Sequence, residues 1–71
     1  MKNNNRLREI RKAHGLSLEA VAVEIGVSYS TLINWEAGKV DPPVSKGIKL
    51  SKFYGVSIYD LFPDEEKEAG Q

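Results

Sequence analysis

Cysteine is absent from this 71-residue chain, and so is any long apolar run. Without cysteine there is no disulfide framework and no thiolate metal site, which suits a protein of the cytoplasm. No apolar stretch approaches the length of about 20 residues that a membrane-spanning helix needs. The first residues, MKNNNRLREIRK, lack the apolar core of a signal peptide. We therefore expect one small soluble domain without a membrane partner.

Net charge is absent as well, because ten Lys and Arg residues balance ten Asp and Glu residues. The balance is uneven, since residues 1–39 carry a charge of +2 and residues 40–71 a charge of −2. Four of the acids fall within residues 64–71, DEEKEAGQ, which we expect to be a flexible acidic tail after a domain covering residues 1–63. No glycine-rich phosphate loop, catalytic triad order or zinc spacing is present, so we expect no enzyme, no metal and no cofactor.

The strongest pattern covers residues 18–37, LEAVAVEIGVSYSTLINWEA, and predicts two short helices joined by a tight turn. The first helix has apolar residues at helical spacing: Leu18, Val21, Ala22 and Ile25. Gly26 supplies the left-handed residue that ends this helix, and Ser28 is predicted to cap the next one. These features are typical of a helix-turn-helix, whose second helix enters the major groove of DNA.

A helix over about residues 4–14 is predicted ahead of this pair. One face of that helix carries Leu7, Ile10 and Arg11. A guanidinium on a partly apolar face is costly unless a carboxylate pairs with it. We therefore expect Arg11 to have a partner elsewhere in the fold, with a solvated charge as the alternative.

A helix over about residues 44–54 is predicted after the break at Pro42–Pro43. The residues expected on its apolar face are Val44, Ile48, Ser51 and Tyr54, with Leu50 and Phe53 beside them. Gly47 lies inside this helix, where it costs about 1 kcal/mol relative to alanine. The glycine is therefore expected to weaken the helix near its centre.

A last short helix is predicted over about residues 58–62, with Ser57 and Asp60 as a capping box at its start. Four of the six aromatic residues crowd into this region: Phe53, Tyr54, Tyr59 and Phe62. So short a helix does not easily bury both Tyr59 and Phe62. We therefore expect an exposed apolar patch that forms a homodimer contact, with simple core packing as the alternative.

The chain resembles the Cro/C1-type (XRE-like) helix-turn-helix family of bacterial and phage repressors. The matching elements are LREIRKAHGLS, LEAVAVEIGVSYSTLINWEAGK, a proline break and a final GVSIYDLF. The resemblance implies an all-α, compact five-helix, lambda-repressor-like DNA-binding domain. It also implies an ion pair between Arg11 and Glu36, which ties the first helix to the third. A bacterial or phage-encoded protein of the cytoplasm, associated with the nucleoid, is implied as well.

The helix over about residues 29–37 is expected to lie in the major groove with its outer residues against base edges. Asn34 can bond adenine through two hydrogen bonds, and Ile33 suits a thymine methyl group. Tyr29 and Ser30 complete the predicted base-contacting set. The residues expected to contact phosphates are Ser28 and Lys39, followed by Arg6 and Lys46. An ordinary surface role is the alternative for each of them.

We predict a sequence-specific DNA-binding transcriptional regulator of repressor type, which binds an inverted-repeat operator in double-stranded DNA as a homodimer. Two departures from the family pattern favour an alternative. Leu18 replaces a common glutamine that touches the DNA backbone, and Asp41 would repel a nearby phosphate. The alternative is a protein-interaction module on the same scaffold, antitoxin-like or an adaptor, with weakened DNA binding.

Overall fold

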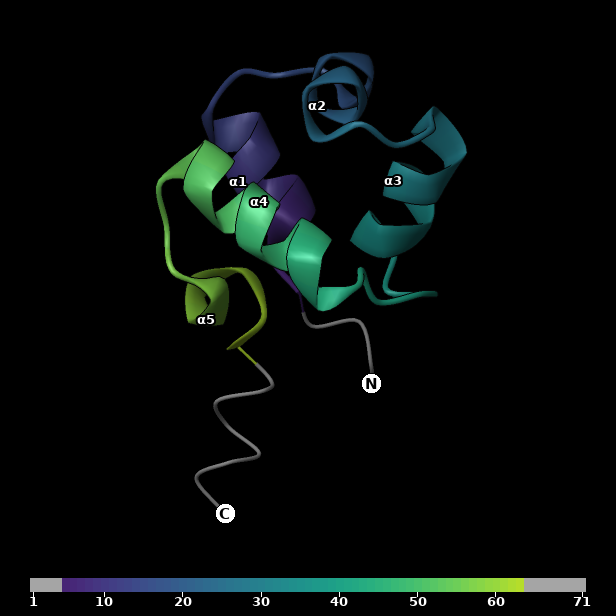
Figure 1. Cartoon of the computed structure of the whole chain (residues 1–71). Coiled ribbons are helices and arrows are strands. Elements are labelled where there is room, and N and C mark those ends of the chain that lie inside the picture. Colours follow the sequence, from purple (N-terminus) through teal and green to yellow (C-terminus); the bar gives the residue numbers. More distant parts are fainter. Residues whose placement is uncertain (1–4, 64–71) are drawn as a thin grey trace.

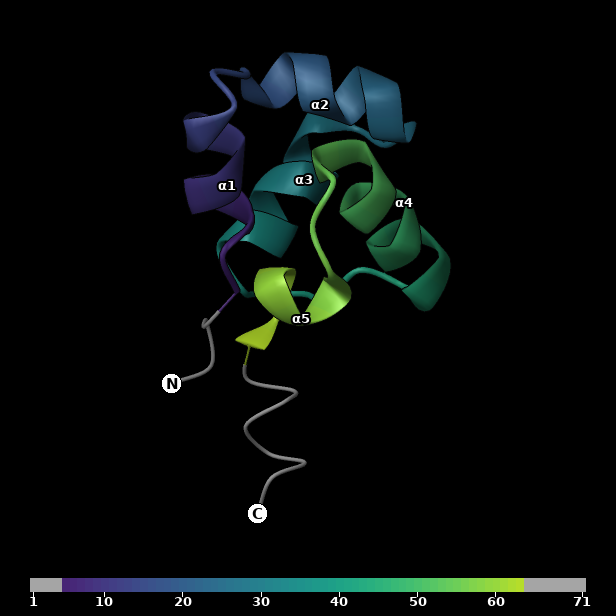
Figure 2. The same cartoon turned by 90° about the vertical axis from the view of Figure 1, so that its left-hand side faces the viewer.

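The computed structural model describes residues 5–63, and this part of the chain folds into helices without any strand. The five helices are α1 (Leu7–Ala13), α2 (Leu18–Ile25), α3 (Tyr29–Glu36), α4 (Val44–Tyr54) and α5 (Ile58–Leu61). Figure 1 shows α3 at one edge of the molecule, and Figure 2 shows α2 across the top with α5 at the opposite end. The predicted all-α, five-helix fold is confirmed. The predicted acidic tail lies outside the described residues.

The core lies where the five helices meet, and every helix contributes to it. The largest side chains that are fully buried are Leu7, Val21, Ile25, Leu32, Leu50 and Leu61. Trp35 of α3 and Tyr54 of α4 are buried beside them. Trp35 is therefore a packing residue on the inner face of α3. No helix within residues 5–63 has the length and apolar character needed to cross a membrane.

Serine side chains begin three of the helices. Ser17, Ser28 and Ser57 each accept a hydrogen bond from a backbone N–H in the first turn that follows. Asp60 completes the predicted capping box, since its carboxylate accepts the backbone N–H of Ser57 at 3.2 Å. Gly26 ends α2 in the left-handed conformation with φ of 84°. The caps and the glycine turn therefore place α3 against α2 as the sequence predicted.

α1 is shorter than the predicted helix over about residues 4–14. The Asn5 side chain accepts the backbone N–H of Leu7 at 3.1 Å, and the helix begins at that residue. At the other end, His14 Nδ1 lies 2.9 Å from the carbonyl oxygen of Ile10. These local bonds set both ends of α1.

The predicted apolar face of α4 is confirmed at Tyr54, which is buried, and is corrected at Val44 and Ile48. Val44 and Ile48 are 77% and 47% exposed, whereas Gly47 and Leu50 are buried. Gly47 lies so close to α5 that a Cβ on it would be 3.3 Å from Cδ1 of Ile58. The spacing of apolar side chains gives no signal for a glycine, so the sequence favoured Val44 and Ile48 as the buried residues. Both of them line a surface groove instead.

Candidate nucleic-acid interface

α3 packs one side on the core and leaves the other side open (Figure 1). Leu32 and Trp35 are buried on the inner side, whereas Tyr29 and Ile33 are 49% and 37% exposed. Asn34 is half-buried at the edge between the two sides. The structure thus brings the four residues predicted to contact bases, Tyr29, Ser30, Ile33 and Asn34, onto one short helix.

The hydroxyl of Ser28 is engaged within the start of α3. Its oxygen accepts the backbone N–H of Thr31 at 3.2 Å, and its proton is donated to Thr31 Oγ1 at 2.8 Å. The first backbone N–H groups of a helix have no partner within the helix and point toward a bound anion. At α3 these groups belong to Tyr29 and Ser30. Sequence reasoning missed Thr31, although the Ser-x-x-Thr spacing signals it.

The two lysines predicted to contact phosphates, Lys39 and Lys46, lie after α3 in the chain. The backbone N–H of Lys39 donates to the carbonyl oxygen of Asn34 at 3.0 Å, which holds this residue just beyond the end of α3. Lys46 is half-buried in the first turn of α4. Neither lysine takes part in an ion pair within the described residues. Both ammonium groups are therefore available to phosphate oxygens.

Arg6 has a different environment. Its guanidinium pairs with the carboxylate of Glu9 at 3.2 Å on the exposed side of α1. The hydrogen bond between them raises the pKa of Arg6 and lowers the pKa of Glu9. The backbone N–H of Arg6 donates to the carbonyl oxygen of Leu61 at 2.8 Å. These contacts place Arg6 beside α5.

Arg11 connects α1 to the last residue of α3. Its Nε and Nη2 atoms donate to the two carboxylate oxygens of Glu36 at 2.8 and 3.2 Å. Nη1 donates to the carbonyl oxygen of Leu16 at 2.9 Å. The hydrogen bond to Glu36 raises the pKa of the Arg11 guanidinium, while burial acts in the opposite direction. A buried, two-pronged ion pair of this kind fixes the position of α3 relative to α1.

Residues 7–61 match the protein family described as helix-turn-helix. The chain belongs to the Cro/C1-type helix-turn-helix family. The HTH-type transcriptional regulator MJ0272 from Methanocaldococcus jannaschii is 42% identical over 64 residues, which cover 90% of this chain and 97% of that protein. The phage CTXphi transcriptional repressor RstR of Vibrio cholerae is 38% identical over 63 residues, which cover 89% of this chain and 57% of the repressor.

The fold of this helix-turn-helix protein has a counterpart among crystal structures. The restriction-modification controller protein C.AhdI from Aeromonas hydrophila superposes with a TM-score of 0.73 at 33% identity. The match covers 80% of this chain and 86% of that protein. The family and these relatives confirm that the chain is a DNA-binding transcription regulator, and they do not favour the alternative of a protein-interaction module.

Leu18 and Asp41, the two departures from the family pattern, both lie outside α3. Leu18 is half-buried and packs against the core at the start of α2. Asp41 is exposed in the loop between α3 and α4, where it borders the surface groove. Neither residue lies on α3, so the outer face of that helix keeps its polar and apolar contact groups.

Proposed function

We propose that this regulator acts as a repressor that binds an inverted-repeat operator with α3 in the major groove. The observation that carries the proposal is the open outer face of α3, held in place by its buried inner face and by the Arg11–Glu36 ion pair. The similarity to a phage repressor supports repression. We place this activity in the cytoplasm, at the nucleoid.

Base readout is assigned to the outer residues of α3. The amide of Asn34 can donate to N7 and accept from N6 of one adenine, and the methyl groups of Ile33 suit the thymine methyl. Tyr29 and Ser30 lie in the first turn, the part of a recognition helix that meets base edges in this binding mode. These four residues would set the operator sequence.

Phosphate contacts are assigned to Lys39, Lys46 and the first backbone N–H groups of α3. Lys39 lies in the loop that leads from α3 to α4 and Lys46 lies in the first turn of α4, so we assign both to one strand of the DNA backbone. Ser28 contributes by fixing the first turn of α3, because its hydroxyl bonds Thr31. Arg6 contributes least, because it is paired with Glu9.

A homodimer is proposed through the surface between α4 and α5. A groove of about 420 Å³ lies there, with Val44, Ile48 and Phe62 among its lining residues. Tyr59 on its rim is 55% exposed. A second copy would cover this apolar surface. Binding to an inverted repeat requires two α3 helices about 34 Å apart, the distance between successive major grooves on one side of DNA.

Selection from random duplex DNA at about 100 mM salt, near physiological screening, tests the proposal. Enrichment of an inverted repeat is the expected result, and the spacing of its halves reports the geometry of the dimer. A single short site would retain sequence reading and reject the dimer. A pool without any enriched sequence would reject sequence-specific binding.

The enriched operator then tests Asn34. Asn34→Ala is expected to cost about 1–3 kcal/mol of binding free energy and to relax specificity at one base pair. Binding is measured by titration of the operator and of variants changed at each position. An equal loss on all of these sequences would reject the assignment to base readout.

A pair of matched substitutions tests the dimer. Ile48→Asp places a charge in the groove, whereas Val23→Asp places the same charge on the exposed side of α2, where Val23 is 80% exposed. Sedimentation equilibrium is expected to give a dimer for the wild type and for Val23→Asp, and a monomer for Ile48→Asp. Equal masses for the two variants would place the dimer contact elsewhere.

A further inference from the structure

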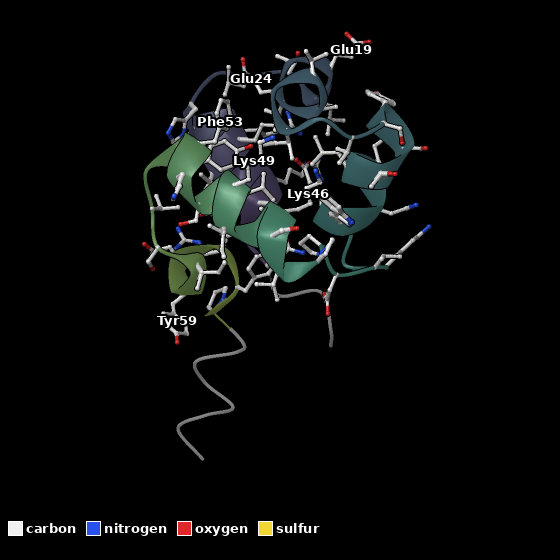
Figure 3. All side chains as sticks on the ribbon, viewed as in Figure 1. Glu19, Glu24, Lys46, Lys49, Phe53 and Tyr59 are labelled. Atoms are coloured by element: carbon white, nitrogen blue, oxygen red, sulfur yellow. The ribbon has the colours of Figure 1, made fainter. Side chains whose placement is uncertain are left out.

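α4 carries a band of three lysines, Lys46, Lys49 and Lys52, and no acidic residue. Figure 3 shows the first two along α4. The ion pairs within residues 5–63 are those of Arg6 with Glu9 and of Arg11 with Glu36, so they leave this lysine band unpaired. The band is therefore a local charge of +3 with no carboxylate partner in the described part of the chain.

The lysine band runs diagonally across the helix. Residues that are three apart are rotated by about 60° around an α-helix. Lys52 lines the groove between α4 and α5, whereas Lys46 and Lys49 lie outside that groove. Lys46, in the first turn of α4, is the residue assigned above to a DNA phosphate. The band thus leads from the α5 side of the helix to the proposed DNA interface.

Residues 64–71, DEEKEAGQ, carry four carboxylates and one lysine, a net charge of −3. The segment begins two positions after Phe62, which lines the same groove as Lys52. Eight extended residues span up to about 26 Å. The helical rise from Lys46 to Lys52 is only about 9 Å. The segment therefore matches the lysine band in charge, follows in sequence a residue that lines the same groove as Lys52, and is long enough to span the band.

We propose that segment 64–71 binds the lysine band of α4 and is displaced from it by DNA phosphates. The effect on DNA binding rests on the proposed function. A tethered anion acts at a high effective concentration, so it competes well with weakly held ligands. Non-specific DNA is held mainly through its phosphates, whereas an operator gains base contacts as well. The segment therefore raises the ratio of operator binding to non-specific binding.

A spin label tests the contact without DNA. The chain has no cysteine, so Gln71→Cys provides a single attachment site. We expect paramagnetic broadening of the NMR signals from the amides of residues 46–52 at low salt. The signals should recover at about 1 M salt, where the Debye length is about 3 Å.

The control carries the same label on a segment without carboxylates. Its substitutions are Asp64→Asn, Glu65→Gln, Glu66→Gln and Glu68→Gln. This neutral segment is expected to give no selective broadening of residues 46–52. Broadening that is missing from the wild-type segment, or that is equal for both segments, would overturn the proposal.

DNA titration tests the consequence. At about 50 mM salt the neutral segment is expected to raise affinity for random duplex roughly tenfold, because phosphate contacts dominate there. The gain for the selected operator should be smaller. In a second background, the lysine band is neutralised by Lys46→Gln, Lys49→Gln and Lys52→Gln, and the gain should disappear.

Two further outcomes of the DNA titration distinguish a failure of this proposal from a failure of the proposed function. A gain that persists without the lysine band would mean that the segment repels DNA from a distance, and would overturn the proposal. Failure of every variant to bind any duplex would overturn the proposed function instead. The spin-label result does not depend on DNA, so it would still decide whether segment 64–71 occupies the band.

Discussion

The tripeptide Gly-Val-Ser joins two pairs of helices in this protein, α2 to α3 at residues 26–28 and α4 to α5 at residues 55–57. Both glycines are left-handed, with φ of 84° and 71°. Both valines pack against the core, and both serines cap the helix that follows. The same local chemistry therefore reverses the chain twice.

The helices that follow the two turns differ. α3 has eight residues, ends at the buried carboxylate of Glu36, and presents Tyr29 and Ile33 outward. α5 has four residues and leaves Tyr59 55% exposed. The turn therefore sets the direction of the helix that follows it, whereas the length and outer residues of that helix set the kind of partner it contacts. The outer residues of α3 suit the polar edges of DNA bases, whereas Tyr59 of α5 suits an apolar surface.

We expect the largest effect on stability from the loss of the ion pair that holds the last residue of α3. Arg11→Ala removes a guanidinium that bonds both Glu36 and a backbone carbonyl, and leaves a buried carboxylate without its partner. We expect a loss of about 3–5 kcal/mol in the free energy of unfolding, measured by urea denaturation. Arg6→Ala is the control, because the Arg6–Glu9 pair is exposed. Equal losses for the two variants would show that the ion pair does not hold α3.

The next largest effect is on the pH dependence of stability and involves Tyr54 of α4. Tyr54 is buried at the end of α4 with its ring 5.2 Å from that of His14, and burial raises its pKa from 10.0 to about 12. The fold therefore favours the neutral phenol. Its stabilising contribution is complete below pH 10 and is lost as the pH rises through 12, an effect of about 2 kcal/mol.

Tyr54→Phe removes this ionisation. We expect the variant to lose less stability than the wild type between pH 10 and pH 12, as measured by thermal unfolding. Tyr59→Phe, at an exposed position, should follow the wild type. If the wild type and Tyr54→Phe lose the same stability in this range, the phenol of Tyr54 is not the group that titrates.

Much of the fold could be predicted because its signals are local. Ser28 and Ser57 were expected as caps from their place just before apolar runs, and Gly26 as a left-handed turn residue. Each of these depends on a few neighbouring residues. The burial of Gly47 could not be predicted in this way, because it results from the approach of Ile58 in the next helix, α5.

The candidate DNA interface could also be predicted only in part. The spacing along α3 separates an outer face from an inner one, and the structure has the same separation. The spacing does not say how a hydroxyl is used, since this depends on the rotamer. The proton of Ser28 is donated to Thr31, and the guanidinium of Arg6 turns toward Glu9. Both side chains looked available in the sequence and are engaged in the fold.

We expect the smallest effects on stability at two glycines, Gly47 within α4 and Gly55 at its end. Gly47→Ala gains about 1 kcal/mol of helix propensity but brings its Cβ to 3.3 Å from Cδ1 of Ile58. The end of an isoleucine side chain can move by a few tenths of an ångström, so we expect a net change below about 1 kcal/mol. Gly55→Ala meets open space but has a left-handed backbone, so it should cost about 1–2 kcal/mol. Urea denaturation compares the two. A larger loss at Gly47 would mean that the contact between α4 and α5 is rigid, and that this glycine shapes the groove between them.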